Sequence, residues 1–226
     1  MDSKYTDITI ILDRSGSMSH LRMDTIGGIN TFLNDQKKLD GDKVLLTLVQ
    51  FSTASEVIIN KTDIVLVDPL TAQDYIPGGG TALLDAVGDA IYKAGKRFRS
   101  MQEAQRPSKV LFVIITDGEE NSSTRFTLGR IKDMITEQQE AYKWQFVFLG
   151  ANQDSFKTSH DYGIYAFNTS NYHNTATGVA DMYGAMSFNV ASFRKDAPEV
   201  VQCRSFWQAD VKDVDNSKRT GTASNP

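Results

Sequence analysis

The chain has 226 residues, 40% of them hydrophobic and 23% charged, which is typical of a globular domain and not of a disordered chain. Its net charge of -4 argues against a nucleic-acid surface, because such surfaces carry a basic stripe. The single cysteine, Cys203, excludes an intrachain disulfide, and no run is apolar and long enough for a signal peptide or a membrane span, so we expect a cytoplasmic protein without membrane contacts.

Apolar runs predict the strands of a sheet. Four of them are nearly continuous in Val, Ile, Leu and Phe, as in strands that helices cover on both faces: Ile8–Leu12, Val44–Phe51, Val110–Ile115 and Phe146–Leu149. A shorter run, Ile164–Phe167, is predicted to be the last strand. The extended segment after Phe51 follows too closely for a crossover helix, which favours an antiparallel edge strand within Glu56–Val67.

Helical periodicity fills the gaps between these runs. It predicts helices over Arg22–Leu39 and Thr81–Phe98, around Leu128–Ile135, and over Val179–Phe193. Strands that alternate with helices predict an α/β fold with a doubly wound, Rossmann-like sheet.

Five oxygen-bearing side chains stand at the ends of these predicted elements. Asp13, Ser15 and Ser17 are spaced i, i+2, i+4 just beyond the first strand, so they point the same way in extended chain. Asp117 follows the third apolar run, which neighbours the first strand at the switch point of a doubly wound sheet. Thr81 comes after three glycines, which permit close backbone approach.

This donor set contains oxygen alone and therefore predicts a hard divalent cation. Mg²⁺ fits best because it keeps water ligands, whereas Mn²⁺ and Ca²⁺ are the alternatives. If the hydroxyls bind the ion directly and the aspartates act through water, the ion keeps an affinity for an anionic ligand. A carboxylate from a partner protein would supply that ligand. Each motif alone is common in turns and helix caps, so the prediction depends on their conjunction.

The order Asp-x-Ser-x-Ser, Thr, Asp-Gly resembles the von Willebrand factor type A domain with a complete metal-ion-dependent adhesion site. The resemblance covers about Asp7 to Lys195 and is closest to stand-alone bacterial or phage domains. It implies a mostly parallel six-stranded sheet with one antiparallel edge strand and helices on both faces. It also implies that the serines and the threonine contact the ion directly and the aspartates largely through water. We expect a domain over residues 1–195 and an extension over 196–226, poorly ordered from about 213.

Other functions are less consistent with these residues. The ion could be mainly structural, in a regulatory or scaffold domain. A metal-dependent phosphoester hydrolase would need a second Asp where Ser15 stands. A serine hydrolase would need a Gly-x-Ser-x-Gly elbow, and His20, His160 and His173 are scattered. We therefore predict a protein-binding module and not an enzyme.

Two charged clusters are predicted to face solvent. Lys96, Arg97 and Arg99 form a basic run at the end of a predicted helix, where the helix dipole favours cations. Glu119 and Glu120 follow Asp117-Gly118 and are predicted to form a solvated acidic loop.

Overall fold

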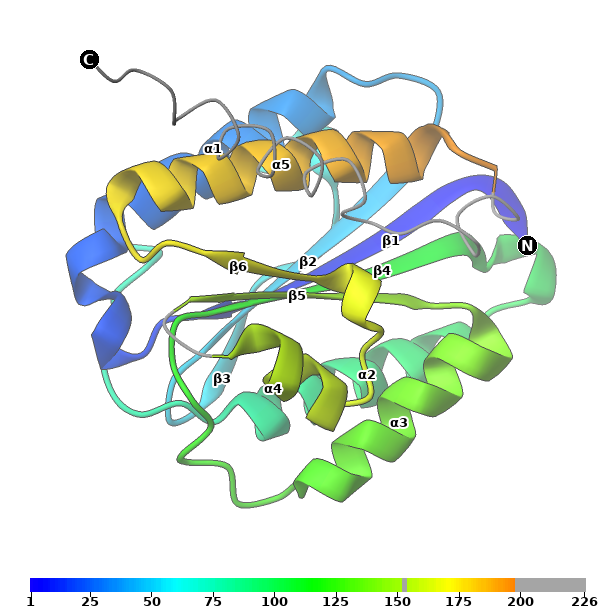
Figure 1. Cartoon of the computed structure of the whole chain (residues 1–226). Coiled ribbons are helices and arrows are strands. Elements are labelled where there is room, and N and C mark those ends of the chain that lie inside the picture. The colour runs from blue at the N-terminus through cyan, green and yellow to red at the C-terminus, as the bar shows by residue number, and fades with distance from the viewer. Residues whose placement is uncertain (152–153, 198–226) are drawn as a thin grey trace, which may run out of the picture.

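The computed structural model describes residues 1–151 and 154–197, in which six strands form one sheet of order β3-β2-β1-β4-β5-β6 (Figure 1). All neighbouring pairs are parallel except β2 and β3, which are antiparallel. The predicted doubly wound sheet with one antiparallel edge strand is confirmed. The strands are β1 (Asp2–Asp13), β2 (Lys43–Phe51), β3 (Ser55–Asp63), β4 (Pro107–Thr116), β5 (Gln145–Ala151) and β6 (Thr169–Tyr172).

Helices cover both faces of the sheet (Figure 1): α1 and α5 lie on one face, and α2, α3 and α4 lie on the other. None of the helices in the described ranges combines the length and apolar character that crossing a bilayer requires. The helices are α1 (Arg22–Lys37), α2 (Leu83–Ser100), α3 (Leu128–Tyr142), α4 (Ser155–Asp161) and α5 (Ala176–Lys195), with short 3-10 turns at Gly16–Leu21, Ile64–Leu66, Glu103–Gln105 and Ala166–Asn168.

The central strands are apolar at nearly every position because each face packs into its own core. In β4, Leu111, Val113 and Ile115 pack into the core shared with α1 and α5. The alternate residues Phe112 and Ile114 pack into the core shared with α2 and α3. All five side chains are at most 1% exposed. Strands β1 and β4 are thus held from both sides, and their carboxyl ends are fixed in space.

The last predicted strand is wrong. Within Ile164–Phe167, Ile164 is buried in the core, while Tyr165 and Phe167 stack on each other with ring centroids 5.1 Å apart. The edge strand β6 begins two residues later and pairs with β5 through its backbone, so its polar sequence gives no apolar signal. Helix α4 was missed because seven residues are too few to show helical periodicity. The predicted extension is described only as far as residue 197, so it stays a prediction.

The basic run at the end of α2 is not wholly solvated. Arg97 donates two hydrogen bonds of 2.8 Å to the carboxylate of Asp7 on β1, which is 1% exposed. Only Lys96 and Arg99 are exposed as predicted. Because Asp7 is distant along the chain, periodicity could not indicate the buried ion pair.

Helices α1 and α5 approach each other closely at Gly28. A Cβ atom at Gly28 would stand 2.0 Å from Cδ2 of the Tyr183 ring, which is 1% exposed. At the adjacent Gly27, which is exposed, a Cβ atom would meet nothing within 4 Å. Close packing of the two helices therefore requires a residue without a side chain at position 28.

We predict that Gly28→Ala lowers the free energy of unfolding by about 1–3 kcal/mol, because the Tyr183 ring would have to move within a filled core. Gly27→Ala is the matched control and should raise stability by up to about 1 kcal/mol, because alanine has the higher helix propensity. Urea unfolding of both variants measures the difference. Equal stability of the two variants would contradict this account of the helix contact.

Candidate metal centre

The first predicted motif forms a tight turn at the carboxyl end of β1. Asp13 is fully buried, and its Oδ1 accepts a hydrogen bond of 2.7 Å from the backbone N–H of Ser15. This bond turns the chain so that the hydroxyl oxygens of Ser15 and Ser17 lie 3.0 Å apart. Ser15 is buried while Ser17 is exposed, so the turn opens to solvent on the Ser17 side.

The glycine loop before α2 is bound to this turn by its backbone. Gly16 N–H donates to Gly79 O at 3.1 Å, and Gly78 N–H donates to Arg14 O at 2.8 Å. Gly79 has φ of +83°, a conformation that favours glycine. Thr81 follows and is 3% exposed, but it does not cap α2, whose first residue is two positions further on. Its hydroxyl forms no hydrogen bond within residues 1–151 and 154–197.

The second carboxylate lies just past the end of β4. Asp117 is 5% exposed, and its Oδ1 accepts a hydrogen bond of 2.5 Å from the Ser17 hydroxyl. Its Oδ2 accepts one of 3.3 Å from Asn174 Nδ2. The preceding residue, Thr116, donates from its hydroxyl to Oδ2 of Asp13 at 2.6 Å. The ends of β1 and β4 are therefore linked through side chains at the switch point of the sheet.

Oxygen atoms from three separate segments converge beside Gly118. A Cβ atom on this glycine would stand 3.3 Å from Thr81 Oγ1, 3.7 Å from Ser17 Oγ and 3.9 Å from Asp13 Oδ2. The other two predicted side chains are hydrogen-bonded to Ser17. The structure thus brings all five predicted residues together, and a side chain at Gly118 would enter the space between them.

The two carboxylates share this space without a basic partner. In the described part of the chain, no Lys or Arg forms an ion pair with Asp13 or Asp117. Arg14, between the ligand candidates, pairs instead with Glu56 at 3.3 Å. The negative charge at this end of the sheet is therefore not neutralised by a neighbouring side chain.

Burial is the main cause that raises the pKa of the Asp13 carboxyl above its ordinary value. Hydrogen bonds from Thr116 and Ser15 oppose this shift, and the nearby charge of Asp117 adds to it. A cation placed between the carboxylates would have the opposite effect, because it favours their charged forms.

The donors fit a hard cation. Around an octahedral Mg²⁺ with Mg–O distances of ~2.0–2.1 Å, adjacent ligands lie about 2.9 Å apart. The Ser15 and Ser17 hydroxyls already lie 3.0 Å apart. Within the described ranges, no three His, Cys, Asp or Glu side chains gather as a metal site, so the hydroxyls are essential to this donor set.

Sequence reasoning missed two residues that support the site. Thr116 lies just past the apolar run Val110–Ile115, and its hydroxyl bridges Asp13 and the Gly118 backbone. Tyr75 lies in a loop without periodicity, and its hydroxyl donates to the backbone oxygen of Asp13 at 2.6 Å. Neither role has a signal in the sequence, because each depends on segments that meet only in the fold.

The predicted acidic loop is also partly structural. Glu120 accepts hydrogen bonds from the backbone N–H groups of Leu84, Ser122 and Ser123, so it joins the loop to the start of α2. Asn121 Oδ1 accepts from Thr81 N–H at 2.9 Å, and Thr81 O accepts from Asn121 N–H at 3.0 Å. The loop therefore holds Thr81 in place, and only Glu119 is exposed as predicted.

Comparison with known proteins finds a matching domain family and solved structures with a similar fold. A model of the von Willebrand factor type A domain matches residues 7–201. Among solved structures, von Willebrand factor type A from Catenulispora acidiphila is 17% identical with a TM-score of 0.54, over 84% of this chain and 43% of that chain. Proximal thread matrix protein 1 from the mussel byssus, with a zinc-occupied MIDAS motif, is 14% identical with a TM-score of 0.58, over 84% and 48%. The manganese-loaded TRAP protein of Plasmodium vivax is 16% identical with a TM-score of 0.53, over 81% and 74%.

At these identities the solved structures show a shared fold alone. The chain spans less than half the length of the first two. No curated protein matches the chain. The family model, however, covers most of the chain, including Asp13 and Asp117 on the two sides of the switch point. The chain therefore belongs to the von Willebrand factor type A domain family.

Proposed function

We propose that this domain is a metal-dependent protein-binding module. Its ligands for Mg²⁺ are Asp13, Ser15, Ser17, Thr81 and Asp117, and an Asp or Glu side chain of a partner protein completes the coordination. The observation that carries this proposal is the convergence of hydroxyl and carboxylate oxygens from three segments on one point beside Gly118, at the carboxyl ends of β1 and β4.

The hydrogen bonds support different roles for the hydroxyls and the carboxylates. Both oxygens of Asp13 already accept hydrogen bonds, from Ser15 N–H and from the Thr116 hydroxyl. The Thr81 hydroxyl has no such partner in the described residues. Following the family resemblance, we assign direct contact to Ser15, Ser17 and Thr81 and contact through water to the two aspartates, and the hydrogen bonds of Asp13 and the free Thr81 hydroxyl in the described residues support this division. With neutral inner ligands, the bound ion supplies a positive charge that attracts an anionic side chain.

Two structural relatives support a divalent ion at such a site. One is named for a zinc-occupied MIDAS motif, and the other is manganese-loaded. For this chain we favour Mg²⁺ over Mn²⁺ and Ca²⁺, because three direct hydroxyl ligands leave positions for water and for the side chain of the partner. That the domain stands alone in a bacterial or phage protein and is cytoplasmic stays a prediction from the sequence.

We favour binding over catalysis. His20, three residues after Ser17, lies against the backbone oxygen of Ser17 at 2.9 Å and not against a hydroxyl that it could activate. Ser15 stands where a phosphoester hydrolase would need an acid. The runner-up function is a regulatory or scaffold domain with a mainly structural ion. In that case chelation would lower the melting temperature without releasing the partner.

We predict that Thr81→Ala abolishes most of the rise in melting temperature that Mg²⁺ gives the natural protein, because it removes one ligand. Capture of a partner from lysate should occur with Mg²⁺ and be lost with a chelator or with Thr81→Ala. Ser19→Ala is the matched control, since its hydroxyl lies in the same turn but donates to Gly16 O. Normal, Mg²⁺-dependent capture by Thr81→Ala would contradict the role given to Thr81.

We predict opposite effects of Asp13→Asn with and without Mg²⁺. The folded-state pKa of Asp13 is raised, so its contribution to stability is present at low pH and is lost as the pH rises through that pKa. At pH 7 without metal, the amide should raise the melting temperature because it removes a buried charge. With Mg²⁺ in excess, the natural protein should melt at the higher temperature, because ligand binding stabilises the folded state. Differential scanning calorimetry in a chelator and in Mg²⁺ tests both signs, and a variant that melts lower in both would contradict this electrostatic account.

A further inference from the structure

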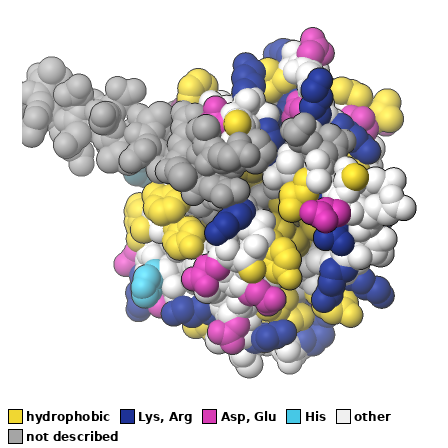
Figure 2. Space-filling view, turned by 90° about the vertical axis from the view of Figure 1, so that its right-hand side faces the viewer, with side chains coloured by type: hydrophobic (Ala, Val, Ile, Leu, Met, Phe, Trp, Pro, Cys, Tyr) yellow, Lys and Arg dark blue, Asp and Glu magenta, His cyan; other side chains and the backbone are white. Residues whose placement is uncertain are grey.

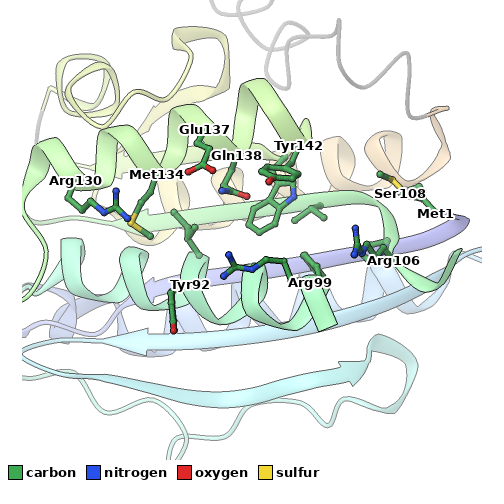
Figure 3. Close-up of a pocket in the computed structure, with 16 residues that line it drawn as sticks. Met1, Tyr92, Arg99, Arg106, Ser108, Arg130, Met134, Glu137, Gln138 and Tyr142 are labelled. Atoms are coloured by element: carbon green, nitrogen blue, oxygen red, sulfur yellow. The ribbon is translucent and has the colours of Figure 1, made fainter. Parts of the chain in front are cut away.

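A hollow lies between α2 and α3, and its lining runs from Met1 and Arg106 at the amino end of β4 to Arg130 in the first turn of α3 (Figure 3). Its volume is about 310 Å³, and its walls include the apolar side chains of Phe98, Met134 and Trp144. Trp144 stacks on Phe112 with centroids 5.4 Å apart and meets the edge of Phe98 at 5.5 Å, so this wall is firmly packed. Figure 2 looks at this end of the molecule and shows apolar side chains that reach the surface between charged ones.

Three arginines surround this apolar floor: Arg99 on α2, Arg106 before β4 and Arg130 on α3. Figure 3 shows the side chains of Arg99 and Arg130 in the space between the two helices. Neither guanidinium has a hydrogen bond or ion pair in the described ranges, and Arg106 donates only through Nε, to the Met101 oxygen. Glu137 is the one carboxylate in the lining, so the hollow carries net positive charge.

Arg99 and Arg130 differ from the other arginines in the described part of the chain. Four of those, Arg14, Arg97, Arg125 and Arg194, pair with carboxylates, and Arg22 donates to two backbone oxygens. The two guanidinium groups without a partner both line the hollow between α2 and α3. Their donors are therefore available to a ligand.

We propose that this hollow is a second binding site, for a small organic carboxylate with an apolar body such as a fatty acid. The floor buries the apolar body, and the planar guanidinium groups bind the carboxylate, for which their geometry is suited. The volume is near the lower end of the range for small-ligand pockets. None of the five proposed metal ligands is among the described residues that line the hollow, so this site is separate from the metal centre.

Gly95 allows the hollow to be blocked without disturbing the fold. This residue lines it from α2, and a Cβ atom there would meet nothing within 4 Å. Gly95→Leu should therefore place its side chain in the open space and keep α2 intact, since leucine has the higher helix propensity.

The test is isothermal titration calorimetry of the full chain with laurate in a buffer that contains a chelator. Dodecanol, a neutral analogue, is titrated in the same way for comparison. We expect laurate to bind the natural protein and dodecanol to bind more weakly. Gly95→Leu and the double variant Arg99→Gln/Arg130→Gln should each weaken laurate binding by at least about tenfold. The control Lys96→Gln/Lys132→Gln removes the same charge from the exposed surface of the same helices and should change the affinity by less than about twofold.

Several results would overturn the proposal. These are absence of laurate binding, equal binding of dodecanol, an equal loss in the lysine control, or full binding by Gly95→Leu. Light scattering provides a further check. If the natural protein is a dimer and Arg99→Gln/Arg130→Gln is a monomer, the hollow is a contact with a second copy of the chain. All titrations contain a chelator. A negative result for laurate therefore does not bear on the proposed metal centre, and a negative result for Mg²⁺ binding does not bear on the hollow.

Discussion

Two carboxylates buried side by side at the carboxyl ends of the two central strands set the main electrostatic constraint on the site. Asp13 and Asp117 are at most 5% exposed, and no basic side chain in the described residues pairs with them. Burying charge is unfavourable unless hydrogen bonds or a cation compensate. The adjoining loops supply hydrogen bonds from Ser15, Ser17 and Thr116, and our proposal assigns the remaining compensation to a metal ion.

The loops that provide these donors are joined to each other by hydrogen bonds. Backbone hydrogen bonds join the turn after β1 to the glycine loop through Gly16 and Gly79, and reciprocal bonds join Thr81 to Asn121. Each segment therefore fixes the position of its neighbour beside the carboxyl ends of β1 and β4. A site whose ligands are positioned in advance loses less conformational entropy on binding than one assembled from mobile loops.

The metal centre and the hollow between α2 and α3 have opposite electrostatic character. At the carboxyl end of β4, Asp117 contributes to a compact set of oxygen donors, and no basic side chain of the described residues pairs with it. In the hollow, Arg99 and Arg130 lie beside an apolar floor and pair with no acidic side chain of the described residues. One fold can therefore present two surfaces that select different ligands.

The sequence by itself determined the sheet class, most elements and the five candidate ligands, because continuous apolar strands, helical periodicity and short motifs at strand ends are local signals. It did not determine β6 or α4, because a polar edge strand depends on pairing with β5 and a seven-residue helix is too short for periodicity. Only the tertiary structure decided that Arg97 is paired with Asp7 and that Glu120 and Asn121 hold α2 and Thr81. It also decided that the guanidinium groups of Arg99 and Arg130 have no partner among the described residues. The physical reason is that charge pairing and loop support arise between residues far apart in the chain, as with Ser17 and Asp117, which are separated by 100 positions.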